Sequence, residues 1–301
     1  MRNRERNKEA PKVITNAMSV DVEDYFQVSA FENILPKDIW NSLPVRVEHN
    51  TYHILKIFEK HNIKATFFIL GWVAERYPNL VREIVAQKHE VASHGFWHQR
   101  VHTLTPHAFK QDVDSSKKLL EDISGLEVKG YRAPSYSINY RNQWALSVLE
   151  ELGFVYSSSV YPIKHDIYGW PTAPRFKFTS TPGGLIEIPI STLKIGTRNV
   201  PCGGGGYFRL FPYRLSRWAI QQVNQKDQQP CIFYFHPWEI DPNQPKQKNI
   251  NFKTRFRHYH NLSGMQFKLE KLLHDFKWGT IDDVFLESKA STTRIKTGTT
   301  N

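Results

Sequence analysis

The sequence has few cysteines and no long apolar run. Cys202 and Cys231 are the only cysteines among 301 residues, and neither belongs to a paired-cysteine metal motif, so we expect two free thiols and no disulfide framework. No stretch has the length and apolar character of a membrane-spanning helix or of a signal peptide. From these absences we expect a cytoplasmic protein without a transmembrane segment.

Acidic residues are also comparatively few. The sequence contains 29 Asp and Glu and 40 Lys and Arg, which gives a formal net charge of +11. An excess of this size fits an anionic partner such as an acidic glycan or a membrane surface. The basic residues are scattered, however, without the dense stripe of a nucleic-acid groove, so we expect no nucleic-acid partner. Peripheral contact with a membrane stays open, and the sequence does not fix the oligomeric state.

No low-complexity segment divides the chain. Hydrophobic residues make up 40% of the sequence and aromatic residues 13%, enough for one large core. We expect residues 1–12 to be a basic flexible extension and 13–287 to form a single domain. The segment 288–301, rich in Ser, Thr and Lys, has the composition of a disordered tail.

Strand-like and helix-like patterns alternate along the chain. Short apolar runs predict strands at 13–20, 64–70, 90–93, 128–132, 154–159 and 231–235. Apolar residues at helical spacing predict helices at 45–61, 78–87, 106–124 and 142–152. This order predicts a parallel α/β architecture, in which functional groups collect at the C-terminal ends of the strands.

Three carboxylates, Asp21, Glu23 and Asp24, come at the end of the first predicted strand. Carboxylates this close repel one another and lose hydration when buried, so a bound cation or protonation is needed to tolerate them. The alternative is structural, since acidic side chains also cap helices or occupy solvated turns. The cluster gains significance only with other ligands nearby.

Two histidines four residues apart, His94 and His98, follow the predicted strand at 90–93. The spacing alone is weak evidence for a metal, because His49 and His53 have the same spacing on the face of a predicted helix. Together with one carboxylate, however, His94 and His98 form a ligand set that suits Zn²⁺ and leaves a position open for water.

Two further polar residues directly follow predicted strands. Arg132 ends the strand at 128–132, and His236 follows the strand at 231–235. The mouth of one parallel barrel would gather both with the carboxylates and the histidine pair.

Four segments resemble, in family order, the motifs of the polysaccharide deacetylases, the NodB-homology enzymes of carbohydrate esterase family 4. They are Asp21-Val22-Glu23-Asp24, Ser93-His94-Gly95-Phe96-Trp97-His98, Arg132-Ala133-Pro134-Ser135-Tyr136 and Phe233-Tyr234-Phe235-His236. Residues 19–26, 201–209 and 235–239 resemble the subgroup that carries a DUF3473 region, here about 160–287. That subgroup is associated with exosortase-type exopolysaccharide gene clusters.

The resemblance implies a distorted (β/α) barrel of about seven parallel strands and a divalent metal, most often Zn²⁺, with Co²⁺ or others as alternatives. His94 and His98 would bind the metal, with Glu23 or, by a slight preference, Asp24 as the carboxylate ligand. Asp21 would be the catalytic base, Arg132 would orient it, and His236 would be the acid.

The implied reaction removes N-acetyl groups from sugars of an exopolysaccharide or its precursor, so the expected partner is an N-acetylated polysaccharide or oligosaccharide. Two alternatives are an amidohydrolase acting on a small linear or cyclic amide and a catalytically inactive sugar-binding module. The residues expected to contact substrate are Pro134, Ser135, Tyr136, Gly205, Tyr207, Trp238 and Glu239. A backbone N–H after Pro134 would stabilise the oxyanion, and the glycine run 203–206 would bring backbone close to the sugar.

Several positions depart from the family pattern, among them Ser135, which stands where Tyr is usual, so that Tyr136 comes one residue later. Gly95 stands where Ser or Thr is usual, so a hydroxyl that fixes the loop is missing or is replaced by Ser93. Ser157 stands where the subgroup leads us to expect Asp. If that carboxylate tunes the acid, its absence would lower the basicity of His236 unless Asp166 takes its place.

Overall fold

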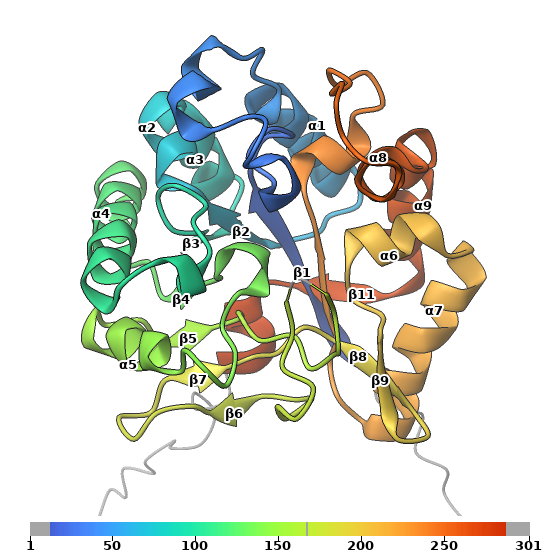
Figure 1. Ribbon diagram of the computed structural model, residues 1–301. Coiled ribbons are helices and arrows are strands. Elements are labelled where there is room, and N and C mark those ends of the chain that lie inside the picture. Colours follow the sequence, from blue (N-terminus) through green and yellow to red (C-terminus); the bar gives the residue numbers. More distant parts are fainter. Residues whose placement is uncertain (1–12, 167, 287–301) are drawn as a thin grey trace, which may run out of the picture.

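A nine-stranded sheet forms the centre of the computed structural model, which describes residues 13–166 and 168–286 (Figure 1). Its order is β10 (Ile232–Phe235), β1 (Thr15–Val22), β2 (Thr66–Ile69), β3 (Glu90–Ser93), β4 (Gly130–Tyr131), β5 (Tyr156–Ser157), β7 (Ile186–Glu187) and β6 (Phe178–Thr179), while β11 (Lys277–Gly279) pairs with β1. Every pairing in the sheet is parallel except that of β6 with β7. The curled sheet confirms the distorted (β/α) barrel, with eight parallel strands where about seven were predicted.

Helices follow most of the strands and lie around the outside of the sheet (Figure 1). The N-terminal part contributes α1 (Val47–Lys60), α2 (Gly71–Arg76), α3 (Pro78–Ala86), α4 (Pro106–Ser124) and α5 (Trp144–Glu151). The C-terminal part contributes α6 (Gly205–Leu210), α7 (Tyr213–Gln222), α8 (Phe252–Tyr259) and α9 (Leu262–Asp275). None of these helices, within the residues described, is long and apolar enough to span a membrane.

The strand β1 lies between β2 on one side and β10 and β11 on the other, and it is buried from its second residue to its last. Polar side chains on it, such as Asp21, are therefore shielded from water. Asp21 therefore lies in an environment where a charge needs a partner.

The predicted elements of the N-terminal half are present, most within a few residues of their expected ends. The strand at 90–93 has the predicted bounds, and Thr105 caps α4 by accepting a hydrogen bond from the N–H of Ala108. The strand predicted at 154–159 is shorter, with two paired residues. The hairpin of β8 (Thr192–Ile195) and β9 (Arg198–Pro201) was not predicted. The expected extension 1–12 and tail 288–301 lie outside the described residues.

Candidate metal centre and active site

The site lies at the C-terminal ends of neighbouring strands. β1 ends at Val22, β3 at Ser93, β4 at Tyr131 and β10 at Phe235, and these strands run parallel in one sheet. The residues at or just past these ends include the predicted carboxylates, both histidines, Arg132 and His236. The sheet therefore brings together groups that are more than 200 positions apart in the sequence.

Glu23, His94 and His98 form a buried cluster in which the three ligand atoms lie within 4.8 Å of one another. Glu23 Oε2 is 2.5 Å from His98 Nε2. His94 Nδ1 is 2.8 Å from the carbonyl oxygen of Arg132, so Nδ1 donates its proton there and Nε2 keeps its lone pair. A second hydrogen bond of this kind is typical of histidines that bind metals. One carboxylate and two imidazoles thus converge as a fitting donor set for Zn²⁺.

The charge states of the cluster agree with a ligand role. Burial lowers the pKa of His94 to about 4, so its imidazole is neutral at pH 7. Burial alone would raise the pKa of Glu23, but the neighbouring His98 and His236 outweigh it and hold that pKa well below its ordinary value. Metal ligands must be deprotonated, and both groups meet this condition at neutral pH.

Asp24, the slightly preferred carboxylate ligand, is not part of this cluster. Its Oδ2 accepts hydrogen bonds from the backbone N–H groups of Arg46 and Val47, at 2.6 and 2.8 Å, and its Oδ1 accepts one from Tyr25. The carboxylate therefore holds the start of α1, which is the helix-capping alternative. The preference for Asp24 was wrong, because successive side chains at the strand end point in different directions and only that of Glu23 reaches the histidines.

The loop between the two histidines is fixed by Asp112 of α4 and by Ser93. Asp112 accepts hydrogen bonds from the backbone N–H groups of Phe96 and Trp97. Gly95 has φ +75°, and a Cβ there would lie 2.8 Å from Asp112 Oδ2, so glycine is required for both reasons. Ser93 Oγ accepts from the N–H of Gly95, and the loop-fixing hydroxyl is therefore replaced by Ser93.

Asp21 is held beside this cluster by Arg132, which is fully buried. Arg132 Nη1 lies 2.5 Å from Asp21 Oδ1 and also donates to Ser19 Oγ, while its other nitrogens donate to the carbonyl and hydroxyl of Ser158. Tyr136 Oη lies 3.3 Å from the second Asp21 oxygen. With every nitrogen of the guanidinium paired, this buried ion pair fixes the direction of the Asp21 carboxylate.

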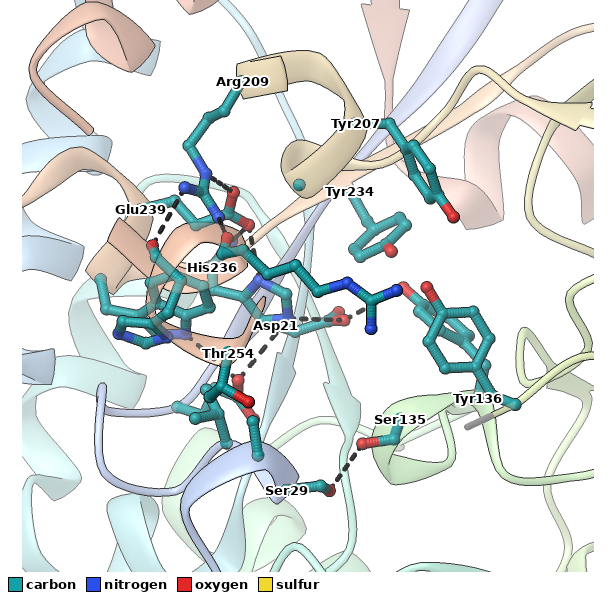
Figure 2. A pocket seen from close by; sticks show the side chains of 18 of the residues that line it. Asp21, Ser29, Ser135, Tyr136, Tyr207, Arg209, Tyr234, His236, Glu239 and Thr254 are labelled. Atoms are coloured by element: carbon teal, nitrogen blue, oxygen red, sulfur yellow. Dashed lines mark hydrogen bonds and ion pairs between the residues drawn. The ribbon is translucent and has the colours of Figure 1, made fainter. Parts of the chain in front are cut away.

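His236 faces Asp21 and Glu23 from the end of β10, with its Nε2 3.9 Å from Asp21 Oδ2 and 3.6 Å from Glu23 Oε1 (Figure 2). Its Nδ1 lies 2.6 Å from Glu239 Oε1. Glu239 in turn accepts from Nε of the buried Arg209 at 2.7 Å. Burial alone would lower the pKa of His236, but Glu23, Glu239 and Asp21 outweigh it and raise that pKa to about 9.

One expectation about His236 was wrong, and one residue has a further role. Glu239, expected to bind substrate, lines the cavity, and its buried carboxylate also orients His236. Asp166 does not replace a missing carboxylate, because it pairs with Lys253 and Arg257 on α8. The basicity of His236 is not lowered by the absence of a carboxylate at Ser157 on β5. Glu239, in the short turn that follows His236, supplies the carboxylate that pairs with the imidazole.

A cavity of about 390 Å³ opens above these groups. Figure 2 shows side chains from several separate segments of the chain around it. Of the residues expected to contact substrate, Ser135, Tyr136, Tyr207, Trp238 and Glu239 line the cavity. Pro134 is buried in the short helical turn Pro134–Tyr136 and does not line it. Ser135 and Tyr136 have φ values of 53° and 48°, a backbone strain of the kind that concentrates at functional sites.

The glycine run is required mainly by packing against β10 and its following turn. Added Cβ atoms at Gly203 and Gly204 would lie 2.2 Å from the Ile232 carbonyl oxygen and 2.6 Å from the Tyr234 ring. A Cβ at Gly205 would lie 2.4 Å from Glu239 Oε1, so this residue, expected to bind substrate, instead makes room for the carboxylate that holds His236. Only Gly206 of the run lines the cavity.

Sequence reasoning missed several residues of the site. Tyr234, Tyr168 and Arg257 line the cavity, and Arg209 holds Glu239. Tyr234 could have been predicted from the sequence, because it precedes His236 by two residues along a strand and therefore faces the same side. Arg209 gave no signal, since its role depends on α6 lying against the turn after β10.

Comparison with known proteins identifies two family models along the chain. The polysaccharide deacetylase model matches residues 38–157, and the model of a domain of unknown function, DUF3473, matches residues 158–286. The peptidoglycan-N-acetylglucosamine deacetylase of Bacillus cereus is 32% identical over 97 residues, which cover 32% of this chain and 35% of the relative. The peptidoglycan deacetylase of Helicobacter pylori is 31% identical over 108 residues, or 36% of each chain.

These matches to curated relatives span about a third of the relatives' length. Among solved structures, the fold resembles that of a Mycobacterium smegmatis protein assigned to the polysaccharide deacetylases, with a TM-score of 0.60 at 17% identity. That similarity covers 91% of this chain and 90% of the solved one.

Proposed function

Because this chain belongs to the polysaccharide deacetylase family, we propose that it is a metal-dependent hydrolase that removes acetyl groups from N-acetylated sugars. The single observation that carries the proposal is the position of Asp21 and His236. Both reach the edge of the Glu23–His94–His98 cluster, and each is held by its own buried partner, Arg132 or Glu239. A sugar-binding module would need neither a fixed base nor a fixed acid.

Glu23, His94 and His98 are the residues that would hold the metal. A divalent ion bound there would supply a Lewis acid that polarises the amide carbonyl and lowers the pKa of a water molecule. Asp21 is then the base that takes the proton from the attacking water, because the ion pair with Arg132 orients its carboxylate. Mutation data on other enzymes give general bases of this kind about 10²- to 10⁴-fold in rate.

His236 is proposed to donate a proton to the nitrogen that leaves as an amine. Its Nδ1 is occupied by Glu239, so Nε2 is the atom that faces the cavity and carries the transferable proton. Trp238 stacks on the imidazole with a centroid separation of 5.1 Å and an interplanar angle of 16°, which fixes the plane of the ring. The acid thus needs no reorientation during the reaction.

The substrate class is proposed from the cavity and from the relatives. Relatives named as deacetylases of peptidoglycan support an N-acetylated glycan. The rings of Tyr136, Tyr207, Tyr234 and Trp238 line the cavity and supply apolar faces on which a sugar ring packs. We propose an exopolysaccharide or its precursor as the natural substrate and the cytoplasm as the location, and both stay predictions.

The test is acetate release from a panel of N-acetylated oligosaccharides and small amides, with protein treated with a chelator and protein reloaded with Zn²⁺ or Co²⁺. We expect release from glycans only after reloading. The variant Asp21→Asn should still bind metal but lose turnover, whereas His94→Ala should lose both. Equal loss of metal in the two variants would remove Asp21 from the role of base. Glycan binding without release under every metal would refute the enzyme and favour a binding module.

A further inference from the structure

One segment of the chain combines several cations with no acidic residue. Residues 242–269 contain six Lys and Arg and no Asp or Glu. Three of the cations, Lys253, Arg255 and Arg257, lie within the eight residues of α8. Although the basic residues were expected to be scattered, these three are therefore close together on one exposed helix.

The same helix exposes large apolar side chains. Phe252 is 82% exposed, the highest value for a large apolar residue in the part of the chain that the structure describes, and Phe256 is 43% exposed. The two phenyl rings lie one helical turn apart with their centroids 6.4 Å from each other and their planes at 20°. Leaving such surface in water is unfavourable by about 25 cal/mol per Å², so an exposed aromatic pair indicates a contact surface.

This surface continues into the mouth of the active-site cavity. Thr254, Phe256 and Arg257 of α8 line the cavity, as does Leu210, the last residue of α6, which is 43% exposed. Figure 2 shows Thr254 on the wall of the pocket that also contains His236. A partner that covers Phe252 and Phe256 would therefore lie directly beside the opening through which substrate enters.

We propose that α8 docks on the surface of an anionic lipid bilayer, with Phe252 and Phe256 entering the interface and the cations meeting the headgroups. Short helices with exposed phenylalanines and a high density of Lys and Arg bind membranes in this way. The three cations of α8 favour an anionic partner over a neutral sugar chain.

The charges of α8 remain available for headgroups. Asp166 pairs with Lys253 at 2.5 Å and with Arg257 at 3.3 Å, and it is the only acidic residue that forms ion pairs with α8 among residues 13–166 and 168–286. These side chains are 43% to 63% exposed, so solvent screens the pairs and they stabilise the fold little. Arg255 is exposed on the same helix. One acid does not neutralise three cations.

If the proposed function is also correct, docking would place the catalytic cavity at the membrane surface, where a lipid-linked glycan precursor presents its sugars. The docking itself does not depend on that reaction. Its test is binding of the full chain to vesicles, which measures no turnover, whereas acetate release from a soluble oligosaccharide tests the enzyme. Failure of one therefore leaves the other intact.

The experiment is sedimentation of the protein with vesicles of phosphatidylcholine alone and of phosphatidylcholine with 30% phosphatidylglycerol, a composition chosen here to be strongly anionic. We expect binding to the anionic vesicles that weakens as salt is raised. The variants are Phe252→Ser and Arg255→Glu, and neither residue lines the cavity. Arg255→Glu should weaken partitioning at least about fivefold, since one basic side chain near an anionic surface contributes about that factor. Phe252→Ser should also weaken it, since it removes apolar surface that would enter the interface.

Matched controls are Leu126→Ser, at a side chain 52% exposed just beyond α4, and Arg82→Glu on α3. The helices α3 and α4 lie away from α8 (Figure 1), and both variants should bind vesicles like the unchanged protein. The proposal is overturned if the unchanged protein ignores anionic vesicles, if it binds the two compositions equally, or if the controls lose as much binding as the α8 variants. Binding to an anionic polysaccharide but not to vesicles would also overturn it.

Discussion

The choice of carboxylate in the metal cluster gives the sharpest prediction, because two adjacent acidic residues have opposite environments. Glu23 reaches the two histidines, while Asp24 accepts three backbone hydrogen bonds near the start of α1. We expect Glu23→Gln to lose metal affinity and keep the fold. We expect Asp24→Asn to keep metal affinity and lose stability.

The expected magnitudes follow from these contacts. Glu23 is the only anionic member of the three-residue donor set, and residues that merely orient a ligand already contribute about 10- to 100-fold to metal affinity. Loss of this direct ligand should therefore weaken binding more than about 100-fold, or about 3 kcal/mol. Asp24→Asn turns an amide N–H₂ toward backbone donors, and the loss of such a cap costs about 1–2 kcal/mol of unfolding free energy.

Titration with Zn²⁺ against a chromogenic chelator measures the affinity, and urea unfolding in the presence of a chelator measures the stability of the metal-free fold. The two variants serve as controls for each other, since each removes one negative charge from neighbouring buried positions. The reasoning is refuted if Asp24→Asn loses the metal while Glu23→Gln binds it as tightly as the unchanged protein does.

Three further outcomes are expected. Gly205→Ala should lower kcat at least about tenfold, since its methyl group would displace Glu239. Gly206→Ala should keep kcat, because its methyl group meets no atom within 4 Å. Steady-state kinetics measures both values. Gly95→Ala, at φ +75°, should lose about 1–3 kcal/mol of unfolding free energy in urea. Burial lowers the pKa of His89 from 6.5 to about 4. Between pH 6.5 and pH 4, His89 is therefore protonated in the unfolded chain but neutral in the folded protein. Stability should thus fall by up to about 3 kcal/mol from pH 7 to pH 4, and by less in His89→Asn; equal pH dependence in both would contradict this.

The N-terminal half of the fold could be predicted because its elements carry local signals. The strand at 90–93 and the helix at 106–124 have the predicted bounds, since an apolar run and a Thr-Pro start define them from neighbouring residues. No helices or strands were predicted for residues 160–230. The strands there are two to four residues long, which is too short for a local period to mark them.

Residue order at the strand ends also determined which chemical groups enter the site. Asp21, His94, Arg132 and His236 each come at or directly after a strand, and parallel strands must present those ends on the same side. The sequence alone therefore sufficed to predict that Asp21, the histidine pair, Arg132 and His236 lie together.

Only the tertiary structure decided what each group does there. Glu23 and Asp24 are adjacent and chemically similar, yet one reaches the histidines and the other holds α1, because side-chain direction depends on the local backbone. Glu239 and Arg209 act on His236 through contacts between the turn after β10 and α6. Spacing along a chain defines which residues are neighbours in sequence, whereas the direction and burial of a polar group depend on the segments packed against it.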